Sequence, residues 1–255
     1  MLAALTRAAS PNLDRCELTF HARQPIDIAL AIAQHHAYEG ALTELGLRVI
    51  SLPPEPDMPD SMFVEDPILV LDELAILTRM GAGSRAREGE SIAAALAPYR
   101  PIRRLTEPAT LEGGDVIRID RELFAGLSTR TNQAGIEQLR AILEPFGYRI
   151  HAVPVDRCLH LKSAACSIGD GAILANTAWL DTTPFPGCRI IPVPPDEPGA
   201  ANVLRIGDTI LMPACFPQTA ELLSREGLRI RTLDISELMK AEAAVTCSSV
   251  IFQIP

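Results

Sequence analysis

The residue types that could carry chemistry in this chain are a thiol, an imidazole and several carboxylates. Cys247 lies in a short polar segment directly before the apolar stretch 249–253. A cysteine combined with a histidine and an acid is the nucleophile-and-base set of covalent catalysis. A single cysteine taken alone is more often a small buried hydrophobe. Cys247 is therefore a candidate nucleophile only together with other groups.

An imidazole and an acid that could serve such a thiol occur upstream. His160 is flanked by two leucines, a setting in which a lone histidine is more often a satisfied core residue than a catalyst. Glu112 precedes two glycines and Asp115, and a Gly-Gly pair lets the backbone approach another group closely. Glu112 could orient a histidine. A plain turn into the strand that begins at Val116 is the alternative.

Three carboxylates, Asp60, Glu65 and Asp66, lie close together just before another predicted strand. Close carboxylates suit a metal ion, acid–base work or a planar cation held by two hydrogen bonds. No nearby pair of histidines accompanies them, so a cationic substrate is favoured over a metal. A solvated acidic turn is the commoner outcome for such a run. Arg85 and Arg130 also lie at boundaries between the predicted elements.

A repeated phrase indicates which elements position these residues. Five similar phrases, four of them beginning with glycine, place arginines at positions 48, 100, 149, 189 and 229. Glycine is a common signal for the end of a helix, and a β-branched stretch follows the phrase in several copies. Each phrase therefore predicts a helix end followed by a short strand.

Hairpin patterns precede four of these phrases. They span residues 68–78, 116–125, 166–175 and 203–212, with acidic or Gly-Asp turns between apolar runs. Helical patterns follow, for example at 87–96, 133–143 and 218–225. The predicted unit is strand, strand, helix, strand, repeated five times.

The first copy would take its opening strand from 249–253, its helix from 26–45 and its last strand from 48–52. A unit this small cannot bury its own apolar face, so the copies must share a core. We expect an α/β fold of five ββαβ units around one axis, forming a single domain over residues 1–255. An ordinary doubly wound α/β sheet is the alternative, and the five regular copies favour the ring.

Six segments together resemble a known family. They are Asp60–Asp66, Thr78–Arg85, Leu111–Asp115, Leu127–Gln133, His160–Ser163 and Thr246–Ser249. In this order they resemble the dimethylarginine dimethylaminohydrolases (dimethylargininases) of the guanidine-modifying amidinotransferase and arginine deiminase superfamily. The fold of that superfamily is the five-bladed α/β propeller called the pentein, which agrees with the five repeats.

The resemblance implies roles for individual residues. Cys247 would be the nucleophile and His160 the general acid and base, oriented by Glu112. The residues implied to bind substrate are Leu18 in a lid, Asp60, Glu65 and Asp66 as carboxylates, and Arg85 and Arg130 on the substrate carboxylate. The implied reaction converts asymmetric dimethylarginine or monomethylarginine to L-citrulline and an amine through a covalent thiouronium-like intermediate, with no metal or organic cofactor.

Two rival functions remain open at this point. Another guanidine-modifying enzyme, such as an arginine deiminase or an amidinotransferase, would need the same thiol, imidazole and carboxylates. A non-catalytic pentein that binds a partner through the ring would lack the Cys–His–acid set, so its presence here argues against that class. Comparing the release of citrulline from arginine and from its methylated forms would distinguish the first rival from a dimethylargininase.

The composition of the chain limits its possible partners and its cellular compartment. The 255 residues carry a net charge of −9 with no basic run, which disfavours a nucleic-acid partner. The longest apolar stretches are far shorter than the roughly 18 residues of a membrane span, and no secretory signal is visible. The six scattered cysteines form no close pair, which predicts a reduced, cytoplasmic protein. The sequence is compatible with a monomer and with a homodimer.

Overall fold

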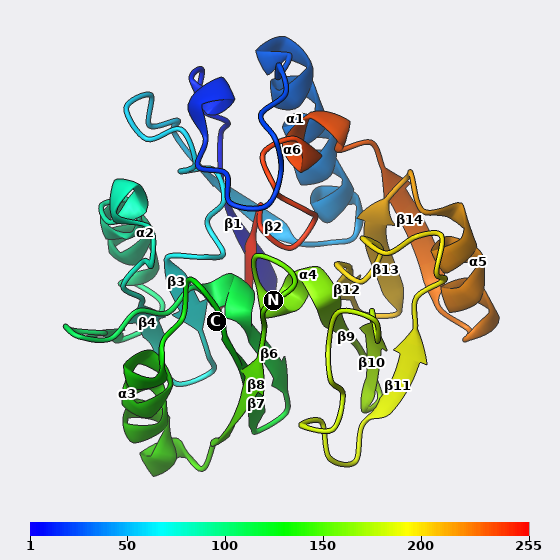
Figure 1. Cartoon of the computed structure of the whole chain (residues 1–255). Helices are drawn as coiled ribbons and strands as arrows, with labels where there is room; N and C mark the ends of the chain where they lie inside the picture. The colour runs from blue at the N-terminus through cyan, green and yellow to red at the C-terminus, as the bar shows by residue number, and fades with distance from the viewer. Residues whose placement is uncertain (255) are drawn as a thin grey trace.

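Five three-stranded sheets surround a common centre in the computed structural model, which describes residues 1–254 (Figure 1). In every sheet the middle strand pairs antiparallel with the strand before it and parallel with the strand after it. The sheets follow one another around the ring in chain order. The predicted five-unit α/β propeller is confirmed.

The strands are short, as expected for units that share a core. Their bounds are β1 (Leu2–Arg7), β2 (Arg48–Leu52), β3 (Ile68–Val70), β4 (Ala75–Leu77), β5 (Ile102–Arg104), β6 (Val116–Ile119), β7 (Glu122–Leu127), β8 (Arg149–Pro154), β9 (Ala165–Gly169), β10 (Ala172–Ala175), β11 (Arg189–Pro192), β12 (Leu204–Ile206), β13 (Thr209–Pro213), β14 (Arg229–Leu233) and β15 (Val250–Gln253).

Helices connect the middle and last strands of four units and lie toward the outside of the ring (Figure 1). They are α1 (Ile28–Glu44), α2 (Gly89–Leu96), α3 (Gln133–Leu143) and α5 (Pro217–Arg225). Side-chain caps begin two of them: Asp27 accepts a hydrogen bond from Leu30 N–H, and Asn132 accepts one from Gly135 N–H. Two one-turn helices, α4 (Leu161–Ala164) and α6 (Ser236–Met239), lie between units.

The fourth unit departs from the predicted pattern because no helix connects β10 to β11 across residues 176–188. Asn176 opens a turn there, its side chain accepting hydrogen bonds from Ala178 N–H and Trp179 N–H. Pro184 and Pro186 lack the backbone donors that a helix would need. The segment still packs apolar side chains into the core beside β10.

The two ends of the chain close the ring. β15 pairs with β1 from Leu2 opposite Gln253 to Leu5 opposite Val250, as the sequence predicted. The first unit then ends with β2, which follows Gly46 in the left-handed conformation at φ 86°. The opening and final segments are therefore one structural unit.

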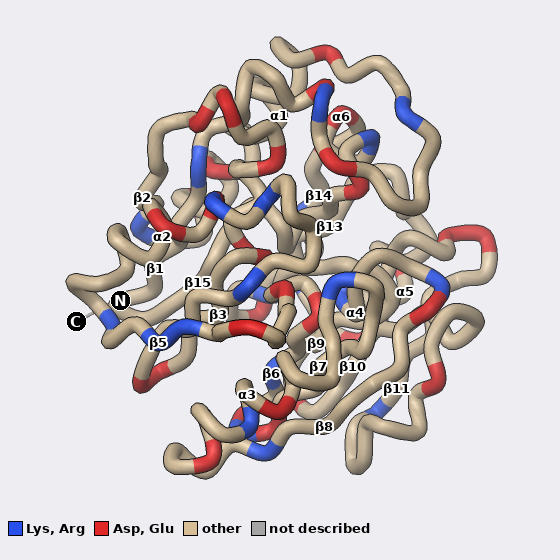
Figure 2. Tube along the Cα trace, turned by 60° about the vertical axis from the view of Figure 1, so that its left-hand side comes forward, with Lys and Arg blue, Asp and Glu red and all other residues tan. Residues whose placement is uncertain are grey.

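Charged side chains tie neighbouring units together at the surface. Arg118 on β6 pairs with Asp72 in the turn of the preceding hairpin, and Arg205 on β12 pairs with Asp170 in the equivalent turn. Acidic and basic residues alternate over the whole trace (Figure 2). None of the helices within residues 1–254 combines the length and apolar character that a bilayer span requires.

Candidate active site

The chemistry-bearing residues lie at equivalent points of the ring, just before the first strand of each unit. Asp66 precedes β3, Glu112 precedes β6 and Cys247 precedes β15. His160 precedes β9 with the short helix α4 between them. Because these first strands lie next to one another around the axis, their loops converge on one end of the ring. Residues up to 181 positions apart in sequence, Asp66 and Cys247, are brought together in this way.

A small cavity at this end is the candidate active site, and we call it the site cavity. Among the residues that line it are Asp60, Asp66, Arg85, Arg130, His160 and Cys247. Its volume is about 20 Å³. Such a space holds about one water molecule. The structure therefore brings the predicted thiol, imidazole and two of the three predicted carboxylates to one enclosed point.

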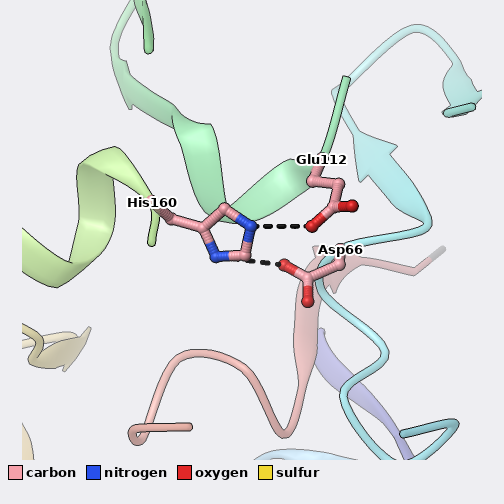
Figure 3. Close-up of side chains that lie close together, drawn as sticks. All are labelled: Asp66, Glu112 and His160. Atoms are coloured by element: carbon pink, nitrogen blue, oxygen red, sulfur yellow. Dashed lines mark hydrogen bonds and ion pairs between the residues drawn. The ribbon is translucent and has the colours of Figure 1, made fainter. Parts of the chain in front are cut away.

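His160 lies between two carboxylates (Figure 3). Its Nε2 is 2.7 Å from Glu112 Oε2, and its Nδ1 is 3.9 Å from Asp66 Oδ1. Burial acts to lower the pKa of His160, but the charge of Asp66 and the hydrogen bond to Glu112 outweigh it and raise the pKa to about 9. Burial acts to raise the pKa of Glu112, yet His160 lowers it to about 2. The pair is thus an imidazolium and a carboxylate at neutral pH.

The backbone around His160 explains the two glycines of the 111–115 segment. A Cβ atom on Gly114 would lie 2.6 Å from His160 Nδ1, so only glycine leaves room for the ring. Asp115 is fully buried and accepts hydrogen bonds from Leu161 N–H, Ser128 and Thr131. It fixes the chain immediately after His160, a positioning role that the sequence did not reveal.

The surroundings of Cys247 favour the neutral thiol. Burial raises the pKa of the Cys247 thiol above its ordinary value, and the charges of Glu65 and Asp66 raise it further. The nearest polar contact of Sγ is Ala244 N–H at 3.5 Å. A cation placed between the thiol and these carboxylates would reverse their effect on the pKa.

The two predicted arginines lie in different environments. Arg85 donates from Nη1 to Asp66 Oδ2 at 2.8 Å and from Nε and Nη2 to the buried carboxylate of Glu88. Arg130 donates from Nη2 to Thr19 Oγ1, while its Nη1 is buried without a hydrogen-bond partner among the described residues. Nη1 of Arg130 is therefore held only by its ion pair with Glu112 at 3.5 Å, whereas Arg85 mainly fixes Asp66.

Glu65 points away from the site cavity, although it neighbours Asp66 in sequence. Its two oxygens accept hydrogen bonds from Lys162 Nζ at 2.5 Å and from Thr246 Oγ1 at 2.7 Å. Asn202, which the sequence analysis did not single out, donates to Thr246 Oγ1. Glu65, Lys162 and Thr246 border a second cavity of about 480 Å³ along the axis, which we call the axial cavity.

Asp60 and Leu18 meet at the segment that covers the site cavity. Both oxygens of Asp60 accept from Glu17 N–H, at 3.2 and 3.0 Å. Burial raises the pKa of Asp60. Leu18 is half-buried and packs against the apolar core between α1 and the last unit. Glu17 in this segment, residues 17–21, lines the site cavity, and the lid role that the resemblance implied for Leu18 stays a prediction.

Asp66, Glu112 and His160 offer three donor atoms within 4.8 Å of one another, close enough for a metal ion on distance alone. However, these donors already bond to one another and to cations. Arg85 pairs with Asp66 at 2.8 Å and Arg130 lies 3.5 Å from Glu112. A metal ion there would add to the positive charge of two guanidinium groups. The donor set suits a hydrogen-bonded acid–base network.

The five-sheet ring with a partly buried thiol, a buried imidazole and buried carboxylates at one end defines the class as a pentein propeller enzyme. The family model described as "N,N dimethylarginine dimethylhydrolase, eukaryotic" matches residues 6–181. The dimethylarginine dimethylaminohydrolase of Streptomyces coelicolor is 42% identical over 97% of this chain and 95% of its own length. That of Pseudomonas aeruginosa is 36% identical over 89% of this chain and 90% of its own length.

Solved structures agree with the sequence relatives. A cysteine-to-serine variant of the Pseudomonas aeruginosa enzyme complexed with citrulline superposes with a TM-score of 0.94 at 34% identity, covering 98% of both chains. A histidine-to-glycine variant of a dimethylarginine dimethylaminohydrolase, as its adduct with S-methyl-L-thiocitrulline, also gives 0.94 at 34% identity, over 99% of this chain and 100% of that one. The chain belongs to the dimethylarginine dimethylaminohydrolase family.

Proposed function

We propose that this chain is a hydrolase that converts Nω-methylated arginines to L-citrulline and a methylated amine, with residues 1–255 as one catalytic domain. The observation that carries the proposal is the content of the site cavity: a thiol, an imidazolium, buried carboxylates and a guanidinium donor without a hydrogen bond among the described residues share it. The named activity of the relatives supports the choice of substrate.

Substrate binding uses charged side chains of both signs that line the cavity. Asp66 and Asp60 attract the guanidinium group, while Nη1 of Arg130, which makes no hydrogen bond among the described residues, takes the substrate carboxylate. Arg85 lines the same cavity, so its implied contact with that carboxylate stays a prediction beside its hold on Asp66. Glu65 contributes by its charge, since its oxygens are taken by Lys162 and Thr246.

The bound cation activates the nucleophile. The carboxylates that raise the pKa of Cys247 are the groups whose charge the guanidinium offsets. The thiol then loses its proton to water, and the thiolate attacks the guanidinium carbon to form a C–S bond. His160, already protonated, gives its proton to the leaving dimethylamine as the C–N bond breaks.

The second half returns the enzyme to its starting state. Neutral His160 takes a proton from water, and the resulting hydroxide attacks the carbon of the thiouronium intermediate. The C–S bond then breaks, and the hydroxyl proton of the intermediate passes to the sulfur, which leaves the neutral Cys247 thiol and the ureido group of citrulline. Glu112 holds the imidazole in place through both halves. These side chains and water account for every proton and bond.

A panel of arginine, monomethylarginine, asymmetric dimethylarginine and agmatine, assayed for ureido product and released amine, tests the proposal. We expect citrulline from the methylated substrates and little product from agmatine, which has no carboxylate for Arg130. Turnover of arginine alone, with ammonia released, would reassign the chain to arginine deiminase chemistry. Absence of turnover with all four would contradict a guanidine-modifying activity.

The setting of the enzyme is also a proposal. All six cysteines are free in residues 1–254, which supports a reducing, cytoplasmic compartment. The partner is a small guanidino amino acid, and the net charge of −9 disfavours a nucleic acid. We propose that it takes part in arginine metabolism by removing methylated arginines.

A further inference from the structure

Glu242 makes an unusual set of contacts with the lid. Its carboxylate accepts hydrogen bonds from three successive backbone N–H groups, those of Thr19, Phe20 and His21. Three consecutive N–H groups that point at one anion form a backbone nest. Here the anion is a side chain from a segment more than 220 residues away.

The place of Glu242 links this contact to the nucleophile. It lies five residues before Cys247, and Ala244 between them donates its N–H to the Cys247 thiol. Glu242 also adopts the left-handed backbone conformation at φ 57°, which is rare and costly for a residue other than glycine. A strained conformation maintained at the edge of a site points to a use for the side chain that it aims.

Glu242 also stands between two cavities of very different size. The site cavity is about 20 Å³, too small for any guanidino amino acid. A neighbouring cavity of about 340 Å³, which we call the vestibule, is lined in part by Phe20, His21 and Trp179. Among residues 1–254, Glu242 is the one charged residue that lines both. Glu242 thus lies between the larger cavity and the small one that Cys247 lines.

Resting on the function proposed above, we infer that Glu242 is the latch of the substrate lid: its carboxylate holds the N–H groups of residues 19–21 so that the lid closes over Cys247. It is a positioning residue and takes no part in bond making. Opening the lid breaks these three contacts, and closing it over bound substrate restores them. Arg130, bonded to Thr19, ties the same lid to the substrate carboxylate.

Two reporters built into the chain test the latch without turnover. Alkylation by neutral iodoacetamide, mapped by mass spectrometry, compares Cys247 with the exposed Cys215 in the same molecule. Acrylamide quenching follows Trp179, the single tryptophan, which lines the vestibule with the lid. Glu242→Gln removes the charge, and Glu242→Gly removes the side chain while relieving the left-handed backbone. Glu226→Gln, at the surface, is the matched control.

We expect the Cys247-to-Cys215 labelling ratio to rise at least about tenfold in both Glu242 variants, with stronger Trp179 quenching, since charge-assisted hydrogen bonds are lost. The KM for dimethylarginine rises by more than kcat falls, and Glu242→Asp restores part of both. Glu226→Gln behaves as wild type. Unchanged labelling and quenching in both variants would overturn the latch. Failure of turnover in the wild-type chain would instead contradict the proposed function, because labelling and quenching do not depend on it.

Discussion

The two cavities on either side of Glu65 and Lys162 differ in size and in chemistry. The axial cavity is about 480 Å³, and its arginines, Arg118 and Arg205, are paired with acids at the surface. The site cavity is about 20 Å³, yet a thiol, an imidazole and two buried carboxylates line it, and Nη1 of Arg130 is buried without a hydrogen bond among the described residues, 3.5 Å from Glu112. Volume alone would select the wrong one. The gathering of a nucleophile, a base and buried charges at one point identifies the site, because such a set costs folding energy that a ligand or a reaction explains.

Replacing a cysteine by serine in each cavity is expected to give the largest difference in turnover between the two cavities. Cys247→Ser is expected to lower citrulline formation by at least about 10⁴-fold, because a serine hydroxyl is a far weaker nucleophile here. Cys166 lines the axial cavity, where burial raises its pKa to about 12. Cys166→Ser is expected to keep near-wild-type turnover. Substantial activity in Cys247→Ser would remove the nucleophile assignment.

The ion pair of Lys162 with Glu65, which borders the axial cavity, can be broken by replacing the lysine. Lys162→Met leaves Glu65 as an unpaired carboxylate in a site where its side chain is 11% exposed. The free energy of unfolding is expected to fall by about 3 kcal/mol or more, measured by urea denaturation. The double variant Lys162→Met with Glu65→Gln is expected to recover most of the loss. No recovery would mean that the packing of the Lys162 side chain, rather than its charge, contributes the lost stability.

The acid–base role of His160 in the site cavity can be tested by substitution. His160→Gln is expected to lower kcat about 100-fold or more, because the leaving amine then receives no proton from a placed acid. The matched control is His151→Gln, since His151 pairs with Glu122 on another part of the ring. A near-wild-type rate for His160→Gln would show that the ring only supports the structure.

The smallest expected effect is on the pH dependence of stability and of kcat/KM. The pKa of His160 is raised from 6.5 to about 9, so its contribution to stability is complete below pH 6.5 and is lost as pH rises through 9. kcat/KM is expected to fall above pH about 9 for the same reason. Glu112→Gln removes the charge that holds the proton and is expected to move this limb to lower pH. An unmoved limb would assign it to another group.

The sequence revealed much of the fold because each unit carries local signals. The hairpin turn at Asp72–Glu73 and the helix end at Gly46 were predicted from residue types alone. The missing helix of the fourth unit was not predicted, although Pro184 and Pro186 are visible signals against it. Each of these signals depends only on neighbouring residues, and the five copies of the unit repeat the same signals along the chain.

The site was predicted in part, because residue types do not reveal side-chain direction. Asp66 and Glu65 are neighbours in a turn, yet one faces His160 and the other faces Lys162. Glu88 could have been found from its spacing of three residues from Arg85. Asn202 and Glu242 gave no such signal, since their partners lie 44 and more than 220 residues away. Such contacts exist only after the ring closes.

Selective modification of Cys247 by a flat cationic electrophile tests the central claim most directly. We predict that 2-chloroacetamidine alkylates Cys247 at least about tenfold faster than neutral 2-chloroacetamide does, because buried carboxylates attract the cation. Dimethylarginine is expected to protect Cys247 and to leave the exposed Cys215 unprotected. Equal rates with the two reagents, or labelling spread over other cysteines without protection by substrate, would contradict a thiol placed to attack a guanidinium group.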